Sequence, residues 1–174
     1  MKQTIFKLGE LFCGPGGLAI AAHDTEEVLN EQTGERYSID HVWGVDKSAS
    51  AIMTFRANLP AAEAYRMDAK AFIKEKLTEA GEIDALAFGF PCNSFSSVGK
   101  RKGVNCQTYG KLYRAGIQVI ALQNPKWFIA ENVSGIGGQD SGRGFRAILQ
   151  ELANAGQGYN VVSHLYKFEE YGVP

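Results

Sequence analysis

Short apolar runs alternate along the chain with longer segments in which apolar residues recur at helical spacing. Apolar runs bounded by Gly, Pro or Asn are typical of strands, and a period near 3.6 residues is typical of amphipathic helices. This pattern predicts strands over 5–12, 39–45, 64–67, 83–88, 127–130 and 159–166. It predicts helices over 18–30, 48–58, 69–80, 109–122 and 144–155, and a polar loop over 93–108. The alternation indicates an α/β fold with a Rossmann-like, doubly wound, mainly parallel sheet.

Composition narrows the class of protein. The 174 residues are 45% hydrophobic and 21% charged, as in an ordinary globular domain with its own core. Eighteen basic and nineteen acidic residues leave a net charge of −1, so any nucleic-acid contact must come from a local patch. The sequence has no apolar targeting segment and no run long enough to cross a membrane. We therefore expect a single cytoplasmic domain with no membrane contact.

The chain has three cysteines, Cys13, Cys92 and Cys106. An odd count at irregular spacing argues against a disulfide framework and fits a reducing compartment. No Cys-x-x-Cys pair indicates zinc, and we expect no metal site. Because a lone cysteine is most often a small buried apolar residue, we expect that role for Cys13 and Cys106.

Polar residues and glycines follow the first three predicted strands. The turn 14–17 (Gly-Pro-Gly-Gly) follows the first strand, and Asp46 and Asp68 end the second and third. In a doubly wound sheet, ligands bind beyond the carboxyl ends of the strands, where glycines let backbone N–H groups approach them. Asp46 is placed to hold ribose hydroxyls, and Asp68 to accept from an adenine amino group. Plain turn and cap roles for these residues remain open, since the turn does not match GxGxxG.

Two reactive side chains follow the later strands. Pro91-Cys92 comes just after the apolar run 83–90, and Glu131 closes the strand over 127–130. A nucleophilic thiol must be reachable and ionisable near neutral pH, which the nearby basic run 100–102 favours. Partial desolvation of a carboxylate raises its pKa and suits it to proton donation. Their position on neighbouring strand ends, beside a glycine turn, favours an active site over isolated structural roles.

Together, these motifs resemble the DNA (cytosine-5)-methyltransferase family in order and spacing over nearly the whole chain. The resembling segments are 10–18 (ELFCGPGGL), 45–46 (VD), 67–68 (MD), 89–96 (GFPCNSFS), 110–113 (GKLY) and 124–133 (NPKWFIAENV). The resemblance implies methyl transfer from S-adenosylmethionine, with S-adenosylhomocysteine as product, to carbon 5 of a cytosine flipped out of double-stranded DNA. It implies that Cys92 adds to ring carbon 6, that Glu131 binds the N3 edge, and that Asn132 orients the Pro-Cys turn. It also implies a role in restriction–modification.

The family's binding residues carry over as two sets. The resemblance implies a cofactor pocket formed by Phe12, Gly14, Gly16, Gly17, Leu18, Asp46, Lys47, Asp68, Ala69, Pro91 and Leu112. It implies DNA contacts from Asn93, Ser96, Lys100, Arg101 and Lys102, although a solvated loop explains the basic run equally well. Three positions depart from the family pattern. Asn93 replaces a glutamine, Lys47 stands where an apolar or aromatic residue often packs on adenine, and Ala69 is unusually small.

The last residues, 171–174 (Tyr-Gly-Val-Pro), resemble the start of the family's Gln-x-Arg-x-Arg motif. We therefore expect an incomplete catalytic domain over 1–174 that lacks the arginine for the cytosine O2 and the target recognition domain. A truncated form, a degraded gene and one half of a split enzyme all remain open. We expect the isolated chain to bind cofactor weakly and not to methylate DNA. Two alternatives are a cofactor-binding subunit completed by a C-terminal partner chain, and RNA cytosine methylation by a related branch of the family.

Overall fold

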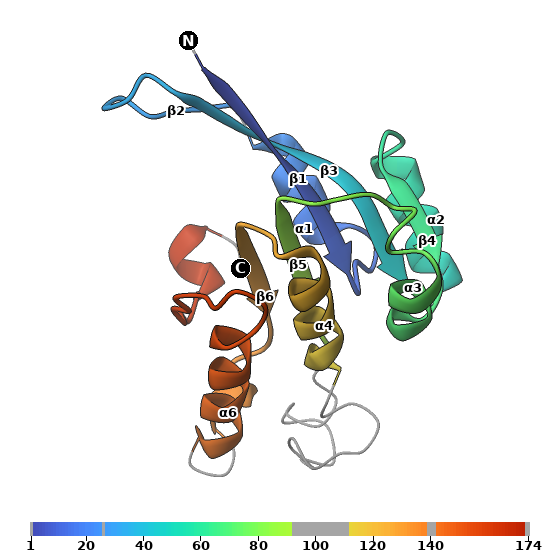
Figure 1. The fold of residues 1–174 in the computed structure, drawn as a ribbon, viewed down its shortest axis with the longest axis vertical. Coiled ribbons are helices and arrows are strands. Elements are labelled where there is room, and N and C mark those ends of the chain that lie inside the picture. Colours follow the sequence, from blue (N-terminus) through green and yellow to red (C-terminus); the bar gives the residue numbers. More distant parts are fainter. Residues whose placement is uncertain (1, 26, 92–111, 139–141, 173–174) are drawn as a thin grey trace.

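The computed structural model of the chain describes residues 2–25, 27–91, 112–138 and 142–172, built around a six-stranded sheet (Figure 1). The strands are β1 (Gln3–Leu11), β2 (Val28–Leu29), β3 (Arg36–Asp46), β4 (Glu63–Arg66), β5 (Ala85–Gly89) and β6 (Trp127–Glu131). The helices are α1 (Gly17–Asp24), α2 (Ala49–Asn58), α3 (Ala69–Glu75), α4 (Tyr113–Gln123), α5 (Gly135–Gly138) and α6 (Arg143–Ala153), followed by the 3-10 helix η3 (Phe168–Tyr171).

Five strands run parallel in the order β4-β3-β1-β5-β6, and the short β2 pairs antiparallel with the start of β3. This arrangement confirms the predicted α/β fold with a mainly parallel sheet. The chain winds from β1 toward β4 on one side and from β5 toward β6 on the other. The order of strands therefore reverses between β1 and β5, which is where such sheets bind their ligands.

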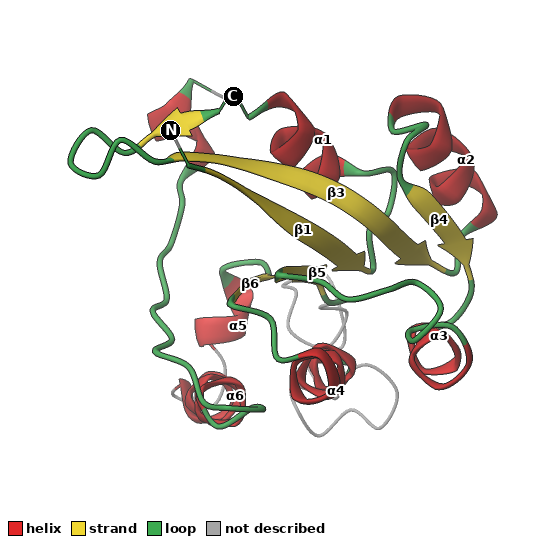
Figure 2. Ribbon diagram, turned by 45° about the horizontal axis from the view of Figure 1, so that its top comes forward, coloured by secondary structure: helices red, strands yellow, loops and turns green. Residues whose placement is uncertain are grey.

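Helices cover both faces of the sheet. Figure 2 shows α1 and α2 on one face and α3, α4 and α6 on the other. The larger core lies on the second face, where Trp43 and Phe88 are fully buried. The α4 helix packs very closely on β5, because a methyl group added at Gly116 would lie 2.5 Å from the Phe88 ring. These packed layers hold the strand ends in fixed relative positions.

The predicted helix over 18–30 is correct only in its first part. The α1 helix ends at Asp24, and Thr25 is extended, with its hydroxyl donating to the carbonyl oxygen of Ala21 at 2.7 Å. The next residues form β2, part of a hairpin with β3 that the helical pattern did not reveal. The Asn30 side chain accepts two backbone N–H bonds within the hairpin turn, which stabilises a turn in place of the helix.

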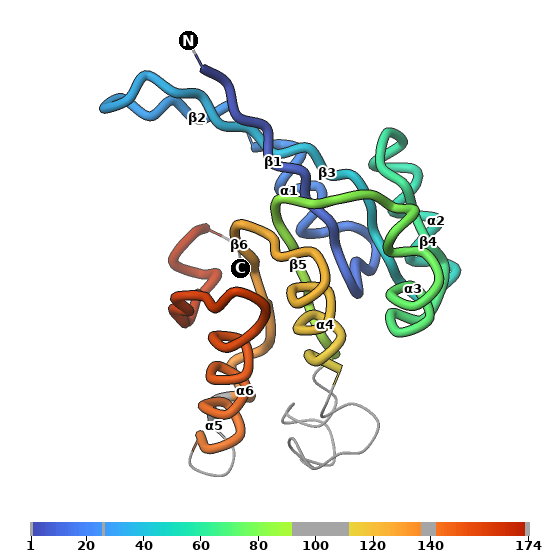
Figure 3. The backbone as a smooth tube through the Cα atoms, viewed as in Figure 1, coloured from blue at the N-terminus to red at the C-terminus, as the bar shows by residue number. Residues whose placement is uncertain are grey.

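The predicted strand over 159–166 is wrong. These residues have no regular secondary structure and pair with no strand in the described part of the chain (Figure 3). Tyr159 anchors the start of the segment through a 2.6 Å hydrogen bond from its hydroxyl to the carbonyl oxygen of Pro125. Beyond it, Val162 is 84% exposed and Leu165 is 61% exposed. Alternating apolar residues predict a strand, but a strand also needs a neighbour for its backbone groups.

The other predicted elements that the structure describes are confirmed, with shifted ends. For example, β3 begins three residues before the predicted start at Ile39, and α3 ends at Glu75 instead of Ala80. The backbone N–H groups of Lys76 and Leu77 both bond to the carbonyl of Phe72, which closes α3 in a tight turn. The predicted loop over 93–108 lies outside the described residues.

Candidate active site

The carboxyl ends of the parallel strands lie in one row along an edge of the sheet. Leu11 ends β1 in register with the penultimate residues of β3 and β5. One residue further along, Asp46 ends β3, and Gly89 ends β5 directly opposite Glu131 of β6. The predicted ribose-binding residue and the predicted catalytic carboxylate therefore share this edge, on either side of the glycine turn that follows β1.

The glycine turn is held in a conformation that suits glycine. Gly14 and Gly16 have φ values of 54° and 101°, a region that other residues rarely adopt. No atom lies within 4 Å of the position that a side-chain carbon would occupy on Gly14 or Gly17. A side-chain carbon added at Gly16 would instead lie 3.1 Å from Phe55 and 3.3 Å from Leu59. The turn therefore exposes its backbone at two glycines and packs against the protein at the third.

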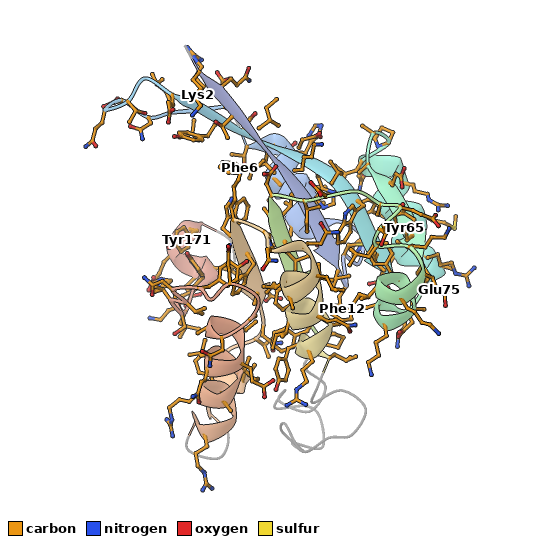
Figure 4. The ribbon with its side chains drawn as sticks, viewed as in Figure 1. Lys2, Phe6, Phe12, Tyr65, Glu75 and Tyr171 are labelled. Atoms are coloured by element: carbon orange, nitrogen blue, oxygen red, sulfur yellow. The ribbon has the colours of Figure 1, made fainter. Side chains whose placement is uncertain are left out.

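Phe12, the residue between β1 and the turn, is also unusual. Its φ is 58°, and it is one of two non-glycine residues with positive φ in the described part of the chain. A bulky side chain in this region is strained, and such strain is often found at ligand-binding sites. Its half-buried ring packs against the main core (Figure 4). Phe12 is thus fixed at the point where β1 turns toward the predicted cofactor.

Asp46 connects the glycine turn to the start of α2. Its Oδ2 atom accepts from the N–H of Gly14 at 3.0 Å, and its Oδ1 atom accepts from the N–H of Ser48 at 2.8 Å. Asp68 caps α3, with Oδ1 accepting from the N–H of Lys70 at 2.9 Å. The turn and cap roles are therefore present at both aspartates. Because a carboxylate offers about four acceptor sites, these bonds leave capacity for a ligand.

The remaining predicted pocket residues differ in exposure. Lys47 is exposed, whereas Ala69 is buried in the main core beneath the start of α3. Leu18 packs against the small cluster beneath α1. Pro91 and Leu112 are half-buried and stand at the two ends of the segment 92–111. Most of the predicted set thus comes from segments at one edge of the sheet, while Ala69 and Leu18 also contribute to packing.

At the catalytic end, the carboxylate of Glu131 lies beside the end of β5. A methyl group added at Gly89 would lie 3.1 Å from its Oε2 atom. The next residue, Asn132, donates from Nδ2 to the carbonyl oxygen of Phe90 at 2.8 Å. The end of β6, at Glu131 and Asn132, is therefore connected to the backbone that leads into Pro91 and Cys92.

Gly89 and Phe90 were missed as functional positions, because both fit within a continuous apolar run. A glycine at the end of a buried strand, opposite an acidic residue on the next strand, is the signal that could have identified Gly89. The structure explains it, since any side chain there would crowd the Glu131 carboxylate. Phe90 contributes its backbone carbonyl, which no sequence pattern marks.

Several predicted residues lie outside the described part of the chain. These are Cys92, Asn93, Ser96, Lys100, Arg101, Lys102 and Cys106. Cys13 is described, and it is buried as expected. Burial raises the pKa of its thiol well above the ordinary value, and the nearby Glu10 and Asp46 carboxylates raise it further. Cys13 is therefore held as a neutral thiol, which supports its structural role.

Comparison with known proteins identifies the family. The sequence model for C-5 cytosine-specific DNA methylases matches residues 6–174. The chain therefore belongs to the C-5 cytosine-specific DNA methylase family. The family is one of DNA methyltransferases, and methyltransferases generally use S-adenosylmethionine.

Two curated relatives illustrate the similarity. The chain is 45% identical to the type II methyltransferase M.BbvI of Brevibacillus brevis over 178 residues, covering 97% of this chain and 46% of that protein. It is 32% identical to the type II methyltransferase M1.ScrFI of Lactococcus lactis subsp. cremoris over 176 residues, covering 99% and 40%. The chain spans about half the length of these relatives or less.

Solved structures share the fold. The S. pombe Dnmt2 methyltransferase matches with a TM-score of 0.64 at 20% identity, covering 97% of this chain and 47% of that chain. A DNMT2 triple mutant from Spodoptera frugiperda matches with a TM-score of 0.56 at 20% identity, covering 85% and 41%. The likeness confirms the Rossmann-like methyltransferase architecture. Among the described residues, none of the helices is long and apolar enough to cross a membrane.

Proposed function

We propose that this chain supplies the catalytic and cofactor-binding part of an enzyme that transfers a methyl group from S-adenosylmethionine to carbon 5 of cytosine in DNA, within a restriction–modification system. The observation that carries the proposal is the pairing of Gly89 with Glu131 at the ends of β5 and β6. It brings a carboxylate next to the backbone that leads, three residues later, to the proposed nucleophile Cys92.

Each catalytic residue has a defined task in this proposal. The Cys92 thiolate forms a bond to carbon 6 of a flipped-out cytosine, while Glu131 hydrogen-bonds the N3 edge and stabilises the developing charge. Bound S-adenosylmethionine supplies the electrophilic methyl group that carbon 5 takes, with S-adenosylhomocysteine as the product. Loss of the carbon 5 proton then expels the Cys92 thiolate and restores the aromatic ring.

The residues around the glycine turn fit this cofactor. The uncovered backbone at Gly14 and Gly17 suits the approach of the methionine end, near the positive end of α1. Asp46 would hold the ribose hydroxyls and Asp68 the adenine amino group. The aliphatic stem of Lys47 can cover one face of the adenine ring. The remaining residues proposed for this pocket are Phe12, Gly16, Leu18, Ala69, Pro91 and Leu112.

The proposed macromolecular partner is double-stranded DNA. The contacts assigned to Asn93, Ser96, Lys100, Arg101 and Lys102 remain predictions, since these residues lie outside the described part of the chain. RNA is the second candidate substrate. DNA is favoured because the matching family is that of DNA methylases and the 45% identical relative is a type II methyltransferase.

We further propose that residues 1–174 form one catalytic domain that a C-terminal region completes, either in the same polypeptide or as a partner chain. In the described structure, β6 forms one edge of the sheet, and Ile129 on it is 50% exposed. The unpaired segment after α6 exposes Val162 and Leu165. An open strand edge with exposed apolar residues is normally covered in native proteins.

The test uses this chain continued by the C-terminal region of the Brevibacillus relative, hereafter the extended protein. Transfer of a labelled methyl group is measured with duplex DNA and with RNA. We expect transfer to DNA by the extended protein and none by the isolated chain. Cys92→Ser should abolish transfer and preserve S-adenosylhomocysteine binding. Transfer confined to RNA, robust transfer by the isolated chain, or activity of the Cys92→Ser protein would each contradict the corresponding part of the proposal.

A further inference from the structure

A carboxylate and an imidazole are buried together beneath the N-terminus of α1. The side chains of Glu10 and His41 are each 2% exposed, and Oε2 of Glu10 lies 3.0 Å from Nε2 of His41. Neither residue belongs to the proposed catalytic or cofactor-binding set. Because removing such groups from water costs free energy, their burial together indicates a specific role.

His41 reaches Glu10 because of an irregularity in the sheet. Leu8 of β1 pairs with His41 of β3, but the next residue, Gly9, pairs with Trp43. Val42 is therefore an extra residue in β3. In a regular strand, His41 and Trp43 would face the same side of the sheet. The bulge instead turns His41 to the side of Glu10, where its ring lies 5.6 Å from that of Phe55. Bulges commonly redirect a side chain in this way.

The α1 helix begins without a capping side chain of its own. Its N-cap residue is Gly16, and its first turn contains no acidic residue. The backbone N–H of Ala19, at the third helical position, donates to the carboxylate of Glu10. This N–H is one that a capping Ser or Asp commonly satisfies, and a negative charge is favourable at this end of a helix. Glu10 therefore caps α1 from the neighbouring strand.

Two carboxylates thus hold the glycine turn from opposite ends. Asp46 accepts from the N–H of Gly14 at the start of the turn, and Glu10 accepts from the N–H of Ala19 just after it. Burial raises the pKa of Glu10, whereas its hydrogen bonds to His41 and Ala19 lower it. His41 supplies the second hydrogen bond to the Glu10 carboxylate and so fixes its orientation.

We propose that Glu10, oriented by His41, is a positioning residue that holds the glycine turn in the shape required by the cofactor. The inference rests on the proposed function in taking the cofactor as S-adenosylmethionine. Glu10 touches neither the cofactor nor the cytosine in this proposal. It acts through the backbone between Gly14 and Ala19.

The test compares four variants of the extended protein. Glu10→Met and His41→Phe remove the carboxylate and its partner, and Glu10→Gln keeps an acceptor for the Ala19 N–H. The control is Leu152→Ala, which opens a cavity in the main core beneath α6, on the other face of the sheet. Amide hydrogen exchange over 12–22 reports on the turn, and calorimetry measures the affinity for S-adenosylhomocysteine.

We expect Glu10→Met and His41→Phe to speed exchange in the turn and to weaken S-adenosylhomocysteine binding roughly five- to tenfold, as expected for the loss of a cap. Glu10→Gln should stay within about twofold of the extended protein without substitutions, since one acceptor is retained. Leu152→Ala should lower the melting temperature without either effect. If Glu10→Met fails to fold, His41→Phe carries the same comparison.

One outcome for His41→Phe is lost stability without faster exchange in the turn, which is the result expected for Leu152→Ala. That outcome would overturn the positioning role. A different outcome distinguishes the proposed function. If the extended protein without substitutions shows no affinity for S-adenosylhomocysteine while exchange in the turn still responds to His41→Phe, the cofactor assignment fails and the structural part of the inference stands.

Discussion

Asn132 donates a 2.8 Å hydrogen bond from Nδ2 to the carbonyl oxygen of Phe90, across the gap between the ends of β6 and β5. The Oδ1 atom of the same amide accepts from the N–H of Val133 at 3.0 Å. Both ends of the side chain are therefore engaged, and its orientation is fixed. The bond joins the residue after Glu131 to the backbone two residues before Cys92.

Asn132→Ala should impair catalysis more than cofactor binding. Without the bond, Phe90 is no longer held to the residue that follows β6, and misplacement of a nucleophile by about 1 Å can cost about 100-fold in rate. We expect kcat of the extended protein to fall roughly 10- to 100-fold in single-turnover assays. Affinity for S-adenosylhomocysteine should change less than about twofold.

The matched control for this substitution is Asn154→Ala, since Asn154 is an exposed residue at the end of α6. It should leave both parameters unchanged. Equal kcat in the Asn132→Ala and Asn154→Ala proteins would show that the Asn132–Phe90 bond does not support catalysis.

Asp46→Ala should weaken cofactor binding. The substitution removes the proposed ribose contact and also the two backbone bonds that join the glycine turn to α2. We expect the dissociation constant of S-adenosylhomocysteine to rise at least about tenfold, since hydrogen bonds to charged groups contribute about 1.5–3 kcal/mol. Asp40→Ala, at an exposed position on the same strand, is the control. Unchanged affinity in Asp46→Ala would remove Asp46 from the cofactor site.

Two glycine substitutions should separate binding from stability. Gly17 faces open space, so Gly17→Leu should fold with little change in melting temperature yet lose most of its affinity for S-adenosylhomocysteine. Gly116→Ala brings a methyl group against Phe88 and should cost about 1–3 kcal/mol of unfolding free energy. The folded Gly116→Ala protein should bind S-adenosylhomocysteine with unchanged affinity. Unaltered binding by Gly17→Leu would mean that the cofactor does not lie over this turn.

Asp84 should stabilise the folded chain at neutral pH, and this stabilisation should be lost in acid. It accepts from Lys126 at 2.9 Å and from the N–H of Lys7 at 3.1 Å, and these bonds lower the pKa of its carboxyl. A carboxyl with a lowered folded-state pKa stabilises the fold above its unfolded value of about 3.8, and this contribution disappears as the pH falls through the folded value.

Asp84→Asn should therefore lower the melting temperature at pH 7, and the difference from the unaltered chain should shrink as the pH falls below about 3.8. Thermal melts between pH 7 and pH 2 measure it. Lys126→Met removes the partner and should show the same trend. A difference that is constant over this range would contradict the assignment.

The strand ends that form the site could be predicted because apolar runs mark buried parallel strands, and polar residues stop them abruptly. Asp46 and Glu131 were found in this way, and both lie at the predicted edge. The hairpin at β2 was missed because its strand has only two residues, too few for a periodic signal. The segment over 159–166 has the pattern of a strand but no neighbour among the described residues.

The Glu10–His41 pair illustrates a different limit. Glu10 was included only as part of a family motif, and His41 carried no signal at all. Regular alternation would put His41 on the opposite face of the sheet, away from Glu10. A single extra residue in β3 reverses that relationship, and the position of a bulge depends on pairing between strands that the local sequence does not reveal.

The most direct measurement of the proposed chemistry is covalent trapping on duplex DNA that contains 5-fluorocytosine, with the extended protein and S-adenosylmethionine. The fluorine at carbon 5 cannot leave as a proton does, so the enzyme should remain attached to the DNA. We expect mass spectrometry to find one adduct, at Cys92, that requires the cofactor and is absent in Cys92→Ser. An adduct at another residue, or methyl transfer without any trapped adduct, would contradict the role of Cys92 as the nucleophile.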